Sequence, residues 1–303
     1  MSRWPRKVKI VEVGPRDGLQ NEPDIVSITD KLAFINALLD AGVSSLEIGS
    51  MVRPDRVPQM ANTDALVAEV EAEGRGDELI VLVANERGLQ RALAAGARRI
   101  AVFAAASPAF SQRNTGMSLE DALTRFGKIV AEALRESVSV RGYVSTVWWC
   151  PFSGRVEPKA GVDVTQALLQ MGCDEVSVAD TIGAATPGEV RAVLELLLQS
   201  VPVDKVAVHF HDTRGTALAN VLAALDLGVH IIDASAGGLG GCPFAPGARG
   251  NVATEDVLYM LHGMGIETGI DLDALCRATR MMQQVIGRSL PARYLAAGPP
   301  KTS

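Results

Sequence analysis

Apolar and small residues recur at a fixed spacing in four segments of the chain. Each segment has a leucine, a glycine three positions later and an apolar residue four positions after that glycine, as in Leu39, Gly42 and Leu46. The same spacing centres on Gly96, Gly172 and Gly228. A glycine at this place is typical of the end of a helix, and the apolar run after it is typical of a short strand. The pattern therefore predicts four helix-to-strand junctions.

The glycines of this pattern lie 54 to 76 residues apart, which is about twice the length of one strand with its helix. Each interval should therefore hold one more strand and one more helix, and runs rich in Val and Ile occur where those strands are needed. The eight strands predicted in this way lie near residues 9–13, 45–49, 78–83, 99–103, 140–147, 175–179, 205–209 and 231–235. Helical periodicity fills the gaps, as in Leu119, Leu123 and Phe126.

The alternation of strands and helices predicts an α/β fold. Eight such units in about 260 residues match a (β/α)8 TIM barrel better than an open doubly wound sheet. A Rossmann fold is disfavoured because no Gly-x-Gly-x-x-Gly motif follows the first strand. We expect one domain over residues 1–303, with the barrel at about 8–265 and an additional C-terminal helix within about 266–303.

Composition and charge exclude several classes of protein. The 303 residues include 29 Lys and Arg against 35 Asp and Glu, a net charge of −6, which argues against a nucleic-acid partner. Apolar residues make up 48 per cent, so disorder of the whole chain is excluded. No uncharged apolar run reaches about 18 residues and the first residues lack a signal-peptide core, so no membrane segment is expected. Together with only four widely spaced cysteines, these features predict a soluble, cytoplasmic protein.

Polar side chains occur where the predicted strands end, which is the face of a TIM barrel that carries active sites. Arg16 and Asp17 follow the first strand, His209 and His211 end the seventh, and Asn251 lies in the loop after the eighth. In a closed barrel the first strand neighbours the eighth, and the eighth neighbours the seventh. Asp17, Asn251 and the histidine pair should therefore lie in one sector, with both imidazoles on one face.

Two imidazoles, one carboxylate and one amide oxygen form a mixed nitrogen and oxygen donor set. Such a set with open positions suits Mg²⁺, Mn²⁺ or a related divalent cation better than a structural zinc ion. The alternative is that the histidines at positions 209 and 211 are only hydrogen-bonded or exposed. We favour the cation site because the chain has only four histidines and Asp17 is placed to join two of them.

Four further residues have an ordinary and a functional interpretation each. Arg16 is either a surface ion pair or a fixed cation for an oxyanion that develops in a reaction. Glu47 interrupts an apolar strand, so it either pairs with Arg16 or serves as an acid or base. Asp180 is either a helix cap or a substrate contact. Cys242 lies in the glycine-rich loop 237–250, expected to be a mobile lid, and is either an ordinary small residue or a proton donor or thiol switch.

Three motifs together resemble the hydroxymethylglutaryl-CoA lyase family. They are Gly14-Pro15-Arg16-Asp17-Gly18-Leu19-Gln20, His209-Phe210-His211-Asp212, and Gly240-Gly241-Cys242-Pro243 followed by Gly250-Asn251. The resemblance extends over about residues 8 to 295, and the cysteine loop is the motif specific to the lyases. It implies a metal-dependent TIM barrel with an acyl-CoA thioester as substrate and a homodimeric assembly.

The resemblance also implies roles for individual residues. It implies Asp17, His209, His211 and Asn251 as ligands of a divalent cation, and Arg16 as the group that stabilises an enolate. Glu47 would be the glutamate of the site, Gln20 a nearby polar contact, and Cys242 the cysteine of the mobile loop. The implied reaction is retro-Claisen cleavage of 3-hydroxy-3-methylglutaryl-CoA to acetyl-CoA and acetoacetate. Asp17 or His209 is the candidate base and Cys242 or His209 the candidate acid, and the sequence does not choose between them.

Two departures from the family leave the acyl group open. Trp149 stands where the family commonly has glycine, and residues 51–56 differ from the usual pattern. A related 3-hydroxyacyl-CoA, such as citramalyl-CoA, is therefore the alternative substrate, and Trp149 is a candidate substrate contact. A non-catalytic metal-binding barrel subunit is a further alternative. A condensing synthase with a regulatory domain would need a longer chain, and a biotin-dependent carboxyltransferase would need a lysine at a strand end.

Overall fold

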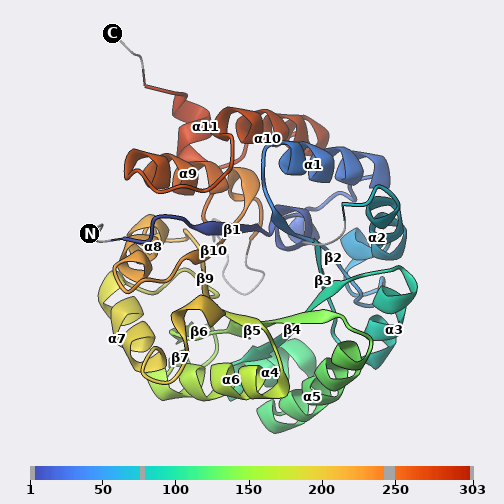
Figure 1. The fold of residues 1–303 in the computed structure, drawn as a ribbon, viewed down its shortest axis with the longest axis vertical. Coiled ribbons are helices and arrows are strands. Elements are labelled where there is room, and N and C mark those ends of the chain that lie inside the picture. The colour runs from blue at the N-terminus through green and yellow to red at the C-terminus, as the bar shows by residue number, and fades with distance from the viewer. Residues whose placement is uncertain (1–3, 76–78, 242–249, 301–303) are drawn as a thin grey trace.

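The chain folds into a closed barrel of eight parallel strands surrounded by helices (Figure 1). The structure is a computed structural model, and it describes residues 4–75, 79–241 and 250–300. Around the barrel the strands follow the order β1-β10-β9-β8-β5-β4-β3-β2, and β2 pairs again with β1. The predicted (β/α)8 fold is therefore confirmed, including the pairing of the first strand with the last.

The barrel strands lie where the apolar runs predicted them. They are β1 (Lys9–Glu12), β2 (Ser45–Ser50), β3 (Leu79–Leu82), β4 (Arg99–Ala105), β5 (Ser139–Ser145), β8 (Glu175–Asp180), β9 (Val206–Phe210) and β10 (Ile231–Ala234). A small hairpin, β6 (Trp149–Cys150) with β7 (Gly154–Arg155), follows β5. The helices are α1 (Ile28–Asp40), α2 (Thr63–Ala72), α3 (Glu86–Ala94), α4 (Pro108–Thr115), α5 (Leu119–Arg135), α6 (Pro158–Met171), α7 (Pro187–Leu197), α8 (Ala217–Leu225), α9 (Thr254–Gly263), α10 (Leu272–Ile286) and α11 (Arg293–Ala297).

The four glycines of the repeat stand at the junctions that the spacing predicted. Their φ angles are 94° at Gly42, 91° at Gly96, 111° at Gly172 and 87° at Gly228. These values lie in the left-handed region, which glycine enters without the steric penalty that a Cβ atom brings. Each helix therefore ends sharply enough that only two residues separate the glycine from the next strand.

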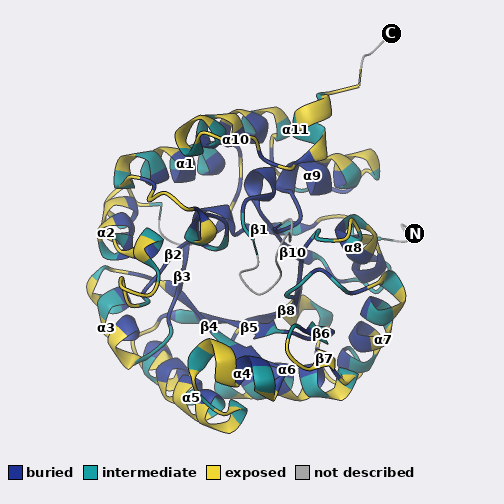
Figure 2. Cartoon of the chain, turned by 180° about the vertical axis from the view of Figure 1, so that it is seen from behind, coloured by how far each residue is buried: buried dark blue, intermediate teal, exposed yellow. Residues whose placement is uncertain are grey.

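Side chains alternate between the two faces of the barrel sheet. Phe34, Leu46 and Val176 belong to the large apolar core between strands and helices. Val11 and Ile231 belong to a smaller cluster that fills the barrel. Figure 2 shows buried strands and helices whose exposed residues lie on their outer sides. Because successive residues of a strand point to opposite faces, His209 and Asp233 share the inward face with Ala207 and Ile231.

A buried ion-pair cluster occupies part of the barrel interior. Arg141 is fully buried in β5, and its Nη2 lies 2.6 Å from Oδ1 of Asp233. Its Nε donates to Oε1 of Glu175 at 2.6 Å, and its Nη1 donates to the hydroxyl of Tyr143 at 2.8 Å. A guanidinium so far from water is tolerable only because carboxylates surround it. Arg141 thereby joins β5 to β8 and β10 through the inside of the barrel.

The C-terminal helix expected from the sequence is α10, and the short helix α11 follows it. The long helix α10 packs along α1 and completes the ring of helices (Figure 1). Arg288, just after α10, pairs with Glu22 near the mouth of the barrel. The amide of Ala292 donates to the carbonyl of Gly237 at 3.1 Å. Within the described ranges, no helix is long and apolar enough to cross a membrane.

The buried position of Arg141 leads to a prediction about stability. Replacing Arg141→Met should lower the free energy of unfolding by about 3–5 kcal/mol, because the buried carboxylate of Asp233 would lose its arginine partner and Glu175 would lose one of its cations. Urea unfolding followed by circular dichroism measures this change. The matched control is Lys159→Ala, which removes an exposed pair with Asp163 and should leave the free energy of unfolding nearly unchanged. Equal losses in both variants would contradict a structural role for the buried pairs.

Candidate metal centre

The turn after β1 places the first two residues of the site. The carbonyl of Val13 accepts hydrogen bonds from the amides of Arg16, Asp17 and Gly18, at 3.2, 2.7 and 3.2 Å. These bonds form the π-helical turn η1 (Gly14–Gly18), in which Pro15 occupies an early position where no amide donor is needed. The turn directs Arg16 and Asp17 to the carboxyl end of the barrel.

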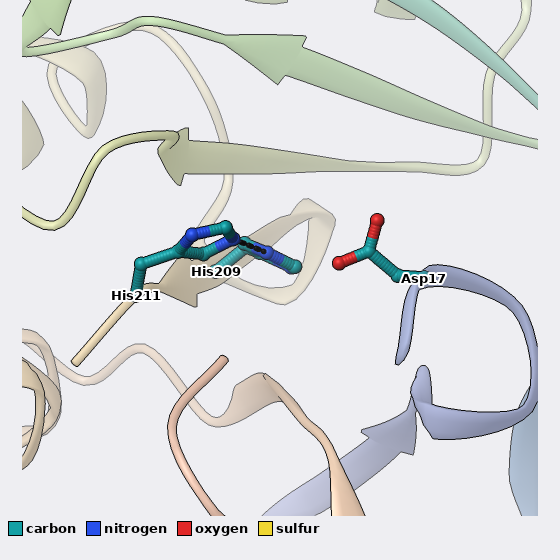
Figure 3. Close-up of side chains that lie close together, drawn as sticks. All are labelled: Asp17, His209 and His211. Atoms are coloured by element: carbon teal, nitrogen blue, oxygen red, sulfur yellow. Dashed lines mark hydrogen bonds between the residues drawn. The ribbon is translucent and has the colours of Figure 1, made fainter. Parts of the chain in front are cut away.

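The histidine pair meets Asp17 across the closure of the barrel. Nε2 of His209 and Nε2 of His211 lie 3.2 Å apart. One ligand atom from each histidine and one oxygen of Asp17 all lie within 4.8 Å of one another. Figure 3 shows the Asp17 carboxylate pointing toward the two imidazole rings. Three of the four predicted metal ligands are therefore brought together in a cluster that a single cation could occupy.

Asn251, the fourth predicted ligand, lies against this cluster. Its Nδ2 donates to Oδ2 of Asp17 at 2.9 Å and to the carbonyl of Leu239 at 3.0 Å. Its Oδ1 is buried and has no hydrogen-bond partner among the residues that the structure describes. A buried carbonyl oxygen without a donor is costly, and coordination to a cation would satisfy it. The donor set therefore fits a divalent cation.

The protonation states of His211 and Asp17 also suit a cation. Burial and the neighbouring His209 lower the pKa of His211 to about 4, so its ring is neutral near pH 7. Burial opposes ionisation of Asp17, yet the charge of Arg16 outweighs it and lowers the pKa of that carboxyl. A neutral imidazole and an ionised carboxylate are the forms that bind metal ions.

Arg16 connects the cluster to Glu47. Its Nη1 donates to Oδ1 of Asp17 at 2.7 Å, and its Nη2 lies 2.5 Å from Oε2 of Glu47. Burial opposes its charge, but Glu47 and Asp17 outweigh this effect and raise the pKa of Arg16 above its usual value. Its buried Nε has no hydrogen-bond partner in the described part of the chain. Arg16 is thus a fixed cation with N–H donors still available, and Glu47 takes the pairing role that the sequence left open.

The remaining predicted residues fall into different environments. Nε2 of Gln20 donates to Oδ1 of Asp17 at 2.9 Å, so Gln20 belongs to the cluster. Asp180 accepts the amides of Ala184 and Ala185, both at 3.0 Å, and so acts as the cap of the turn before α7. The indole of Trp149 donates to Oε1 of Glu189 at 3.2 Å, which places it against the start of α7. Cys242 lies outside the described residues.

Sequence reasoning missed several buried charged residues around the cluster. Oδ2 of Asp233 lies 3.3 Å from Nδ1 of His209, and Nη2 of Arg141 donates to Oδ1 of Asp233. On the outer face of β1, Glu12 accepts the amides of Gly14 and Ala236, both at 2.8 Å. The signal that could have found them is the one that singled out Glu47: a charged residue inside an apolar strand. Asp233 follows Ile231 and Ile232 in that way.

Two buried glutamates hold the backbone that leads into the glycine-rich loop. Glu12 accepts the hydroxyl of Thr254 at 2.6 Å, besides the amide of Ala236. Glu255 accepts the amide of Gly237 at 2.8 Å and the hydroxyl of Thr279 at 2.5 Å. Burial raises the pKa of each of these glutamates to about 7. The stem of the loop is therefore fixed from two sides, and Asn251 returns to the cluster from a defined position.

Fold and site together define a (β/α)8 barrel with a candidate divalent-cation site at the carboxyl ends of its strands. Within that class, the chain matches the HMGL-like family over residues 7–282. The chain belongs to this family.

Three relatives show how close the similarity is. A protein of Pseudomonas aeruginosa, the 3-hydroxy-3-isohexenylglutaryl-CoA/hydroxy-methylglutaryl-CoA lyase, is 47% identical over 293 residues, covering 97% of each chain. The crystal structure of HMG-CoA lyase from Bacillus subtilis superposes with a TM-score of 0.94 at 42% identity, covering 98% of this chain and 99% of that one. An HMG-CoA lyase from Acinetobacter baumannii, in complex with coenzyme A and 3-methylmalate, has a TM-score of 0.91 at 34% identity, covering 97% and 95%.

The position of Asn251 depends on the backbone at Gly240. Gly240 has a φ of 121°, and a Cβ atom there would lie 2.7 Å from Nδ2 of Asn251. Gly240→Ala should therefore displace the amide and weaken the binding of Mn²⁺ about tenfold, as measured by electron paramagnetic resonance titration. Gly241→Ala is the matched control, because its Cβ would meet no atom of the described residues within 4 Å. Unchanged affinity in Gly240→Ala would show that Asn251 is not a ligand.

Proposed function

We propose that this protein is a carbon–carbon lyase that cleaves 3-hydroxy-3-methylglutaryl-CoA to acetyl-CoA and acetoacetate by a retro-Claisen reaction. The observation that carries the proposal is the position of Arg16 beside the cluster of Asp17, His209 and His211. The reaction needs a cation near the substrate hydroxyl that loses its proton, and a fixed positive charge near the enolate oxygen that forms. The lyase names of relatives that match almost the whole chain support the same conclusion.

The cluster would hold a divalent cation through Asp17, His209, His211 and Asn251. When bound, such a cation supplies Lewis acidity that favours loss of the substrate hydroxyl proton. We propose Mg²⁺ or Mn²⁺, because half of the donor atoms are oxygens and the site has no thiolate among its described residues. The relative in complex with coenzyme A supports an acyl-CoA thioester as the substrate class.

Proton transfer and stabilisation of the enolate are assigned to side chains of the protein. Asp17 or His209 takes the proton of the substrate hydroxyl as the C2–C3 bond breaks. Arg16 stabilises the negative oxygen of the thioester enolate through guanidinium donors such as Nε, which has no partner among the described residues. Glu47 holds the guanidinium in place from the inward face of β2. Cys242 or His209 returns a proton to the enolate carbon, which gives acetyl-CoA.

Two properties of the whole molecule stay predictions. We propose a homodimer, as the family resemblance implies, and sedimentation analysis would test it. We propose a cytoplasmic location on the basis of the acidic, cysteine-poor sequence. The free, buried state of Cys150, Cys173 and Cys276 is consistent with a reducing compartment.

Activity assays with metal removal test the proposed reaction. Wild-type protein supplied with Mg²⁺ or Mn²⁺ should release acetyl-CoA from 3-hydroxy-3-methylglutaryl-CoA, and EDTA should abolish the release. Arg16→Gln should lower turnover by about 10³-fold while Mn²⁺ still binds, because the enolate loses its cationic partner. The control is Arg75→Gln, which removes an arginine paired with Asp40 on the outer ring and should keep wild-type turnover. Full activity in Arg16→Gln would remove the arginine from the mechanism.

The acyl specificity is tested separately at Trp149. We expect Trp149→Gly to shift the ratio of kcat/KM values toward 3-hydroxy-3-methylglutaryl-CoA and away from citramalyl-CoA and longer-branched analogues. The physical reason is the change in local volume and the loss of the bond to Glu189, which frees the hairpin β6–β7. A panel of 3-hydroxyacyl-CoA thioesters measures the ratio. Unchanged selectivity would mean that the indole serves only the hairpin and α7.

A further inference from the structure

Asp233 is a buried carboxylate that contacts the cluster from inside the barrel. It lies on β10, is 1% exposed, and its Oδ2 is 3.3 Å from Nδ1 of His209. The register pairs Asp233 directly with His209 across β10 and β9, so the two side chains are neighbours on the inward face. The contact therefore follows from strand pairing and not from a flexible loop.

Asp233 is itself fixed by two donors from other strands. Nη2 of Arg141 donates to Oδ1 at 2.6 Å, and Nη1 of the same guanidinium reaches Oδ2 at 3.2 Å. The hydroxyl of Ser177 on β8 donates to Oδ2 at 2.8 Å. Although burial opposes ionisation, the charge of Arg141 lowers the pKa of Asp233, so the carboxylate is ionised. An ionised carboxylate has no proton to donate, so Asp233 can serve His209 only as an acceptor.

We propose that Asp233 is a positioning residue for the metal centre: it accepts the Nδ1 proton of His209 and so turns the Nε2 lone pair toward the cation. This inference rests on the proposed cation site. A histidine that ligates through Nε2 must carry its proton on Nδ1, and a carboxylate bonded to that proton fixes both the tautomer and the ring orientation. Asp233 does not contact the cation or the substrate itself.

The two histidines of the site differ in this respect. Nδ1 of His211 is buried and has no hydrogen-bond partner in the part of the chain that the structure describes. His209 is therefore the anchored ligand, and His211 is the one whose ring depends on the cation and on backbone geometry. The chain Arg141–Asp233–His209 connects the cation site to the buried ion pairs of β5 and β8.

Asp233→Asn separates the orienting role from simple packing. The amide has the same shape, but only one of its ends can accept. If its oxygen faces Arg141, its NH₂ group faces Nδ1 of His209, which must then give up its proton and carry it on Nε2. We expect the Kd for Mn²⁺, measured by electron paramagnetic resonance on metal-free protein, to rise about 10- to 100-fold.

The matched control is Glu175→Gln. Glu175 accepts Nε of the same Arg141 at 2.6 Å, whereas Asp233 accepts its two Nη groups. This variant removes the same charge from the same buried cluster but leaves the contact between Asp233 and His209 in place. Its Kd for Mn²⁺ should stay within about threefold of wild type, even if both variants unfold at lower urea concentration.

A measurement on the wild-type protein tests the inference without any substitution. Nitrogen-15 NMR of histidine-labelled, metal-free protein at alkaline pH should show His209 as the Nδ1–H tautomer, assigned by its absence in His209→Gln. In folded Asp233→Asn, the same ring should shift to the Nε2–H tautomer. An Nε2–H tautomer in the wild type overturns the inference. This result does not depend on whether Asp233→Asn folds.

The outcomes distinguish this inference from the proposed function. If wild-type protein binds no Mn²⁺, the cation site fails and the inference fails with it. If the wild type binds Mn²⁺ and Asp233→Asn binds it equally well, the cation site stands and only the role of Asp233 is overturned. Equal weakening by Asp233→Asn and Glu175→Gln would assign the effect to loss of the ion-pair cluster, which also overturns the inference.

Discussion

The pairing of β1 with β10 is the interaction on which the site depends. Lys9 to Glu12 pair in parallel with Ile231 to Ala234, and this ladder closes the barrel. Closure brings Asp17, from the start of the chain, beside Asn251, which lies 234 residues later. Without it the candidate ligands would lie at opposite edges of an open sheet. The ladder of backbone hydrogen bonds thus places the ligands, and the turn η1 and the loop stem adjust their directions.

The barrel interior tolerates several charges because each has a partner of opposite sign. Arg141 lies between Asp233 and Glu175, and Arg16 lies between Asp17 and Glu47. Burying such groups costs free energy that an apolar filling would not cost. The ion pairs fix the orientation of the side chains. A guanidinium that is bonded to two carboxylates cannot rotate, and it restricts the rotation of those carboxylates in turn. A retro-Claisen reaction needs this rigidity, because the cation and the enolate must lie at fixed places on the substrate.

The family assignment and the geometry answer different questions. The similarity to HMG-CoA lyases over nearly the whole chain identifies the class of chemistry, whereas the contacts of individual residues indicate how this chain would perform it. Asp180 illustrates the difference, since both its oxygens bind turn amides and its first role is to shape the loop before α7. Trp149 illustrates it again: its indole donates to Glu189 near the start of α7, so the polar contact that the structure shows for it is with the protein itself.

The sequence by itself determined the fold and most of the candidate cation site. Glycine spacing predicted the helix ends, apolar runs predicted the strands, and the two-residue period of a strand placed His209 and His211 on one face. It did not reveal Asp233, Arg141 or Glu12, because a charged residue within a strand shows neither which face it occupies nor which distant strand lies opposite. Register between strands decides that, and register follows from the closure and shear of the whole barrel. The ion pairs around His209 and Arg16 therefore became visible only in the tertiary structure.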